Sequence, residues 1–168
     1  MLLFVIFADD SLIGNQRGLS FERNIYGKNF YKWYQEKNMD SFPYLIIPQD
    51  TSKIWYVNYD SVKTYFDKLR SSSYLADEFF PPLYGYIKKC DSLMQVQHLK
   101  DGIPDGFEFD LILCAQDMKW GYDVVLNGKY NVVINNNTAQ VGIEGSKFHN
   151  FALKKVKNKW LISRNGCI

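Results

Sequence analysis

The stretch Asn29–Gln35 restricts the fold more than any other feature, because it places four aromatic residues within five positions. Phe30, Trp33 and Tyr34 fall on one face at helical spacing, and the run contains no proline or glycine. The pattern predicts a helix over residues 21–38. Such an aromatic face must be buried against another surface, and the strand-rich second half of the chain is the expected partner.

Two further helices are predicted before residue 91. Asp60 is the expected N-cap of the first of them, which ends at 71–73. The other is expected to begin at Pro81–Pro82 and to run through Cys90. The first of the two carries an apolar stripe at i, i+3, i+4 and i+7, formed by Val62, Tyr65, Phe66 and Leu69.

After Asp91 the apolar period changes from helical to alternating, which indicates strands. Asn127–Gly128 and Lys157–Asn158 are expected hairpin turns. The predicted strands are 95–99, 107–114, 123–126, 130–134, 139–143, 148–156 and 160–163. Helices followed by consecutive antiparallel strands predict one α+β domain over residues 21–168, with the helices packed on a curved sheet.

The charge of the chain is nearly balanced but unevenly placed. A net charge of +2 is too small to indicate nucleic-acid binding. Residues 147–168 nevertheless contain six basic residues and no acidic one. The hairpin lysines at 154, 155, 157 and 159 are therefore a candidate interface for a protein partner, and the alternative is that they are solvated lysines on an edge strand.

The first eight residues are apolar and end at Ala8, before Asp9. They resemble the tail of a secretory signal with cleavage after Ala8, followed by a loose arm to residue 20. A short buried strand is the alternative. The run is too short to cross a membrane, so no integral membrane segment is expected, and the predicted location is periplasmic or at the cell surface.

The three cysteines lie far apart and form no Cys-x-x-Cys pair, which disfavours a zinc or redox motif. Cys90 and Cys114 are the hypothesised disulfide, because the third helix and the strand 107–114 should pack together. Two buried free thiols are the alternative. The odd count fits either reduced thiols or one disulfide with one free cysteine, and Cys167 has no assigned partner.

Several stretches together resemble a family of small exported bacterial proteins of unknown function whose fold is similar to the nuclear transport factor 2-like cone. The most specific are Phe30–Tyr34 and Cys114–Asp117. The others are 62–69, 73–75, 78–79, 110–113 and 159–162. The resemblance spans residues 21–163 and implies a cone-shaped sheet and an exported location. It implies no activity.

Asp110 is the main candidate for chemistry. On a strand that faces the helices it could act as a general base with His98 as its partner, and Trp33, Tyr34 and Gln116 would line the same ligand site. The alternative is that Asp110 accepts hydrogen bonds from buried backbone or from a tyrosine hydroxyl.

Other reactive arrangements have less support. Nucleophilic catalysis would need Cys114 beside His98 or His149, which the spacing does not enforce. Asp117 is expected to cap a loop. The two histidines lack metal-ligand spacing, and no phosphate loop or nucleotide motif occurs, so neither a metal nor a cofactor is expected.

The leading functional hypothesis is an exported, non-catalytic binding protein for an apolar or aromatic ligand or for a protein partner, for example an immunity-type inhibitor. The chain is rich in aromatic residues and has no convergent reactive set. A small cone-fold hydrolase or isomerase using Asp110 is the alternative. The third possibility is a structural accessory domain whose cone is filled by side chains.

Overall fold

The structure is a computed structural model, and it describes residues 27–39, 41, 45–46 and 54–168. The predicted signal remnant and N-terminal arm, residues 1–20, lie outside the described residues. The predicted aromatic helix is present, and its described part covers residues 27–36.

Helix α3 (Tyr59–Ser71) has the predicted apolar stripe, and all four of its members are buried. Its N-cap is Asn58 rather than Asp60, because the Asn58 side chain accepts a hydrogen bond from the Ser61 N–H at 3.0 Å. Asp60 instead lies in the first turn, where a negative charge complements the helix dipole.

Helix α4 (Phe80–Gln97) follows the short 3-10 helix η1 (Asp77–Phe79) and begins at the two prolines, as predicted. It continues past Asp91, so the predicted strand 95–99 is wrong. Met94 extends the buried stripe of the helix by one more turn, which favours the helical period. The helix ends in a Schellman motif, in which His98 N–H donates to Gln95 O and Leu99 N–H donates to Met94 O.

The predicted strand 107–114 is also wrong, because the chain turns back on itself there. Asp110 and Ala115 form an isolated antiparallel bridge, and the Cys114 N–H donates to the Asp110 carbonyl at 2.8 Å. Leu111, Ile112 and Leu113 are all buried. A turn can bury three successive side chains, whereas an alternating strand would expose the middle one.

Helix α5 (Met118–Asn127) replaces the predicted loop 117–121 and strand 123–126. Asp117 is its N-cap and accepts from the Trp120 N–H at 3.1 Å. Asn127–Gly128 therefore ends a helix and is not a hairpin turn. Gly121 lies so close to Leu113 and Ala115 that an added side-chain carbon would approach both within 2.7 Å, so α5 packs tightly on the turn.

The remaining strands form an antiparallel sheet in the order β1-β2-β3-β4 within the described residues. Their bounds are β1 (Tyr130–Asn135), β2 (Thr138–Ile143), β3 (Asn150–Val156) and β4 (Lys159–Asn165). The predicted hairpin turn at Lys157 and Asn158 is confirmed, and both residues have the positive φ angles typical of a two-residue turn.

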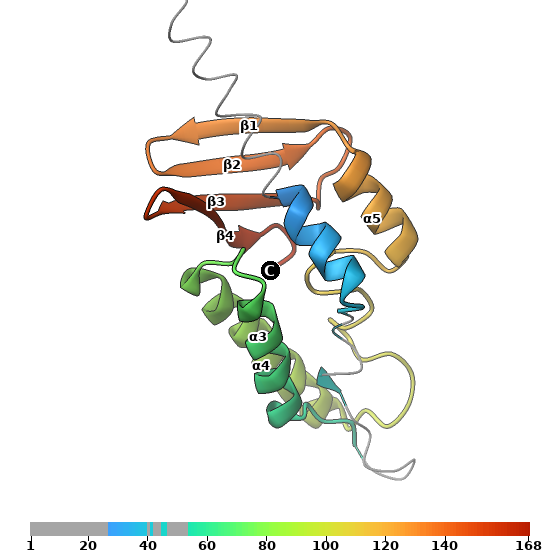
Figure 1. Cartoon of the computed structure of the whole chain (residues 1–168). Helices are drawn as coiled ribbons and strands as arrows, with labels where there is room; N and C mark the ends of the chain where they lie inside the picture. The colour runs from blue at the N-terminus through green and yellow to red at the C-terminus, as the bar shows by residue number, and fades with distance from the viewer. Residues whose placement is uncertain (1–26, 40, 42–44, 47–53) are drawn as a thin grey trace, which may run out of the picture.

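The sheet occupies one end of the molecule, and the α3–α4 pair occupies the other (Figure 1). Residues 74–76 join the two parts, because they run beside β4: Ala76 N–H donates to Ile162 O, and Ile162 N–H donates to Tyr74 O. The predicted α+β class is confirmed. The cone-like curvature implied by the resemblance stays a prediction.

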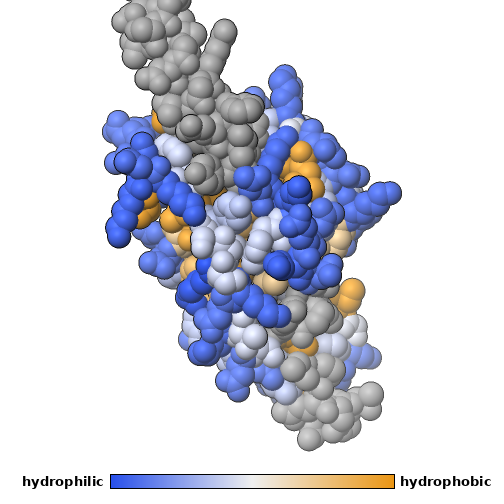
Figure 2. Space-filling view, viewed as in Figure 1, coloured by the Kyte–Doolittle hydropathy of each residue, from blue (hydrophilic) through white to orange (hydrophobic). Residues whose placement is uncertain are grey.

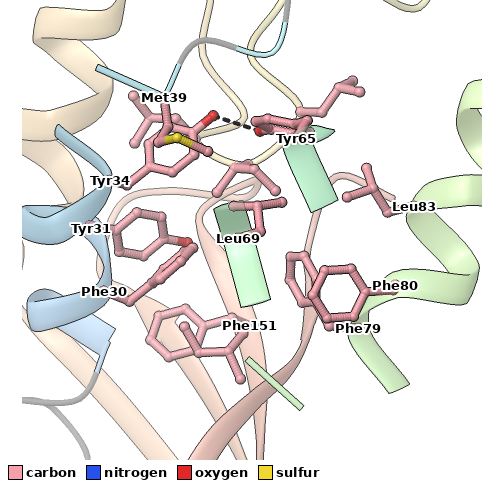
Figure 3. Packing of buried hydrophobic residues seen from close by; sticks show 14 of the residues in the cluster. Phe30, Tyr31, Tyr34, Met39, Tyr65, Leu69, Phe79, Phe80, Leu83 and Phe151 are labelled. Atoms are coloured by element: carbon pink, nitrogen blue, oxygen red, sulfur yellow. Dashed lines mark hydrogen bonds between the residues drawn. The ribbon is translucent and has the colours of Figure 1, made fainter. Parts of the chain in front are cut away.

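The core lies where the first helix, α3, α4 and the sheet meet (Figure 3). Phe30, Tyr31 and Tyr34 enter it from the first helix, and the Tyr31 ring meets the Phe151 ring of β3 at 6.1 Å. An added side-chain carbon at Gly27 would lie 2.5 Å from Phe151, so the helix lies close against β3. Hydrophilic residues cover most of the described part of the face drawn in Figure 2.

Candidate functional site

Asp110 organises the turn that was expected to be a strand. Its Oδ1 accepts from the Ile112 N–H at 2.9 Å and the Leu113 N–H at 2.5 Å. Its Oδ2 accepts from the Tyr34 hydroxyl at 2.8 Å and faces the Ser41 N–H at 3.5 Å. The carboxylate therefore ties the turn to the first helix.

The proton positions in this network follow from its partners. Tyr34 Oη is 2.8 Å from both Asp110 Oδ2 and Tyr65 Oη, and Figure 3 shows the bond between the two tyrosines. An ionised carboxylate only accepts, so Tyr34 donates to Asp110 and Tyr65 donates to Tyr34. The hydrogen bond between the two tyrosine hydroxyl groups thus connects the first helix to α3.

Burial raises the pKa of Asp110 to about 6, although the hydrogen bonds from Leu113, Tyr34 and Ile112 oppose that rise. Burial also raises the pKa of Tyr34 well above its ordinary value, and the nearby Asp110 charge adds to this effect. The alternative interpretation of Asp110, an acceptor for buried backbone and a tyrosine hydroxyl, matches these contacts.

The disulfide joins Cys114 to Cys167, with 5.8 Å between their Cα atoms, so the predicted Cys90–Cys114 bridge is wrong. Cys90 is buried and free. It faces the loop at Gly106, where an added side-chain carbon would lie 2.5 Å from its sulfur. Cys114 instead lies at the end of the Asp110 turn, beside the C-terminal residues.

A second contact fixes the same turn from β4. Asn165 is buried, and its Nδ2 donates to the Leu111 carbonyl at 2.7 Å. The Asp110 carboxylate, the disulfide and Asn165 thus hold residues 110–115 from three sides. A rigid turn of this kind can present its outer surface in a fixed shape.

That outer surface lines a hollow of about 710 Å³, which we call the aromatic pocket. Its walls include Phe109, Trp120 and Phe148, together with the Cys114–Cys167 disulfide. Trp120 is 52% exposed and Phe148 is 63% exposed. Among the described residues of the wall, Gln116 and Asp117 carry the polar side chains.

A smaller hollow of about 280 Å³, which we call the Asp110 hollow, adjoins the aromatic pocket. The two share Phe109, Ala115 and Gln116. Asp110, Glu108 and Ser41 are also in the wall of the Asp110 hollow. The Glu108 carboxylate accepts from the Gly106 N–H at 2.7 Å.

The structure brings only some of the predicted site residues together. Gln116 lines both hollows and Asp110 lines the smaller one, whereas Trp33 and Tyr34 line neither. Tyr34 is fully buried in the core, and Trp33 is half-buried and stacked on Phe30. The role of Asp110 and Gln116 as ligand contacts stays a prediction.

The predicted histidine partners also lie elsewhere. His98 is exposed at the end of α4 and is not among the hydrogen-bond partners of Asp110. His149 is buried, with its Nδ1 2.7 Å from Ser146 Oγ and its ring against Trp120, and burial lowers its pKa. Because Cys114 is in a disulfide, it has no thiolate to serve as a nucleophile.

Phe148 and Trp120 were missed as site residues because they belong to elements assigned to strand or loop. Alternation would have identified Phe148 only as a strand end, and nothing in the spacing pairs it with Trp120. Their exposure becomes visible only when α5 is known to lie beside the turn before β3.

Within residues 27–39, 41, 45–46 and 54–168, no group of three or more His, Cys, Asp or Glu side chains could hold a metal ion. None of the helices in that part of the chain combines the length and apolar character needed to span a membrane. No family model, no curated protein and no solved structure matches this chain.

Proposed function

We propose that this chain is an exported, non-catalytic binding protein, and that the aromatic pocket holds a ligand with an apolar body. The main support for this proposal is the exposure of Trp120 and Phe148 on the wall of a hollow that is large enough for a small molecule. Large aromatic side chains left at the surface around a recess are typical of binding sites.

The surrounding contacts support a preformed site. The turn behind the pocket is held by the Asp110 carboxylate, by Asn165 and by the disulfide. Preformed walls reduce the ordering cost of binding. The Cys114–Cys167 disulfide also supports export, since disulfides persist in oxidising compartments. The resemblance to an exported family with a cone-like fold forms part of the same proposal.

The alternatives have less support from the contacts. Within the described part of the chain, the Asp110 carboxylate accepts hydrogen bonds from backbone N–H groups and from Tyr34, which favours a structural carboxylate over a general base. A protein interface on the basic hairpin has fewer free lysines than expected. Lys154 pairs with Glu78, and Lys159 donates to the Ser73 carbonyl.

Titration with Nile red, an uncharged apolar dye, tests the proposal. We expect saturable fluorescence enhancement with the wild-type protein, and a loss of affinity of about tenfold in Trp120→Ala and in Phe148→Ala, because each variant removes a wall of the pocket. Both side chains are largely exposed, so the fold should tolerate the changes.

Val133→Ala is the matched control, since Val133 is 71% exposed on β1 and lies outside the aromatic pocket. It should bind the dye like the wild type. Dye uptake that is absent from the wild type, or that is equal in all variants, would contradict the proposed pocket.

A further inference from the structure

The charged side chains that the structure describes in the walls of the two hollows are all acidic. Asp117 is the charged residue of the aromatic pocket, and Glu108 and Asp110 are those of the Asp110 hollow. Among the residues that the structure describes, no lysine, arginine or histidine is in either wall. Lysine and arginine slightly outnumber aspartate and glutamate in the chain as a whole, by 20 to 18. The recess is therefore acidic on a weakly basic protein.

Asp117 lies in the same wall of the aromatic pocket as the exposed Trp120 side chain. Its Oδ1 accepts from the backbone N–H of Trp120 at 3.1 Å as the N-cap of α5, so the two residues are separated by less than one turn of the helix. Asp117 itself is exposed. A cation in the aromatic pocket would therefore be attracted both by an indole ring and by a carboxylate of the same wall.

The wall also restricts the kind of cation. Primary ammonium and guanidinium groups carry several N–H donors that need acceptors after they leave water. The described side chains of the aromatic pocket are aromatic rings, a disulfide, an alanine methyl group, one amide and one carboxylate. A quaternary ammonium group has no donor to satisfy and a weakly hydrated, apolar surface, which matches such a wall.

We propose that the aromatic pocket recognises a small organic cation of the quaternary ammonium class, held against Trp120 and Phe148 with Asp117 as its counter-charge. This inference rests on the proposed function and specifies its ligand. Glu108, in the adjoining hollow, adds a longer-range attraction.

Isothermal titration with two matched probes tests the charge requirement. One probe is choline, and the other is its uncharged isostere, in which a tert-butyl group replaces the trimethylammonium group. We expect choline to bind about tenfold more tightly than the isostere, because shape and apolar area are the same and only the charge differs. Trp120→Ala should weaken choline binding about tenfold.

Asp117→Asn separates charge from structure, since asparagine caps a helix as well as aspartate does. It should weaken choline binding by roughly threefold to tenfold and leave the isostere unaffected. Glu108→Gln, which keeps the acceptor for Gly106, is a second charge variant if Asp117→Asn lowers the unfolding temperature, and it should act in the same direction with a smaller effect.

Three results would each overturn the inference. The two probes could bind with equal affinity, the wild type could fail to bind choline, or Trp120→Ala could leave choline binding unchanged. Those results remain distinguishable from failure of the proposed function. The dye titration with Trp120→Ala and Phe148→Ala tests the pocket itself, and it does not depend on charge.

Discussion

At the scale of single residues, the Asp110 carboxylate connects its own turn to the first helix. One carboxylate oxygen accepts two N–H groups of its own turn, and the other accepts the hydroxyl of Tyr34 from a helix 76 positions earlier. A buried carboxylate costs free energy unless such partners surround it. Its raised pKa shows that these partners offset the burial only in part.

This balance predicts a pH dependence of stability. The pKa of Asp110 rises from 3.8 to about 6 on folding, so the folded chain holds the proton more tightly than the unfolded chain. The stability contributed by this proton is therefore complete at low pH and is lost as the pH rises through about 6. Urea denaturation should show the stability of the wild type falling relative to Asp110→Asn by about 2 kcal/mol from about pH 4 to about pH 8.

The asparagine variant is a suitable reference because its amide oxygen can still accept from Ile112 and Leu113, while its amide nitrogen can donate to Tyr34. Asp110→Ala leaves these groups without a partner and should be less stable than Asp110→Asn by about 2 kcal/mol at every pH. Parallel pH profiles for the wild type and Asp110→Asn would refute the raised pKa.

At the scale of elements, the end of α4 decides where the helical half of the chain stops. His98 has a φ of 52°, in the left-handed region that glycine adopts with least strain. The carbonyl groups of Met94 and Gln95 accept hydrogen bonds from the N–H groups of the two residues that follow the helix. A β-like sequence pattern at residues 95–99 did not reveal this cap.

His98→Gly should therefore raise the free energy of unfolding by about 0.5–1 kcal/mol, because the strain of the left-handed residue exceeds the added entropy of glycine in the unfolded chain. Chemical denaturation measures it directly. Gln97→Gly, one residue earlier at the last position of the helix, is the matched control and should lower stability, because glycine there adds entropy to the unfolded chain and relieves no strain. A destabilised His98→Gly would place the helix end elsewhere.

At the scale of the whole molecule, the disulfide joins the turn at Cys114 to the C-terminal residues after β4. The two cysteines are 53 positions apart, so the closed loop includes α5 and the entire sheet. Loop closure of this length contributes about 4 kcal/mol by restricting the unfolded chain. The bridge also forms part of the wall of the aromatic pocket.

Alkylation of the unfolded, unreduced protein should modify Cys90 alone, and reduction should expose all three thiols. Cys167→Ser should lower the free energy of unfolding by about 4 kcal/mol. The Cys90→Ala variant is the control, since it should keep the bridge and its loss of stability on reduction. An unfolding midpoint that reductant leaves unchanged would contradict the Cys114–Cys167 assignment.

Features that depend on the local apolar period and on turn chemistry could be predicted from the sequence. Four features were predictable because each depends on neighbouring residues. They are the aromatic stripe of the first helix, the apolar stripe of α3, the start of α4 at the prolines and the Lys157–Asn158 hairpin turn. They were enough to give the α+β class.

The secondary structure of residues 95–128 and the pairing of the cysteines depend instead on long-range packing. Alternation in a short apolar run such as 107–114 does not distinguish a strand from a turn that buries successive side chains, and here Asp110, Asn165 and Cys167 select the turn. The pairing of Cys114 depends on the position of the C-terminal residues, which no local pattern encodes. The aromatic pocket follows from that same packing, because it forms only where α5, the turn and the C-terminal residues meet.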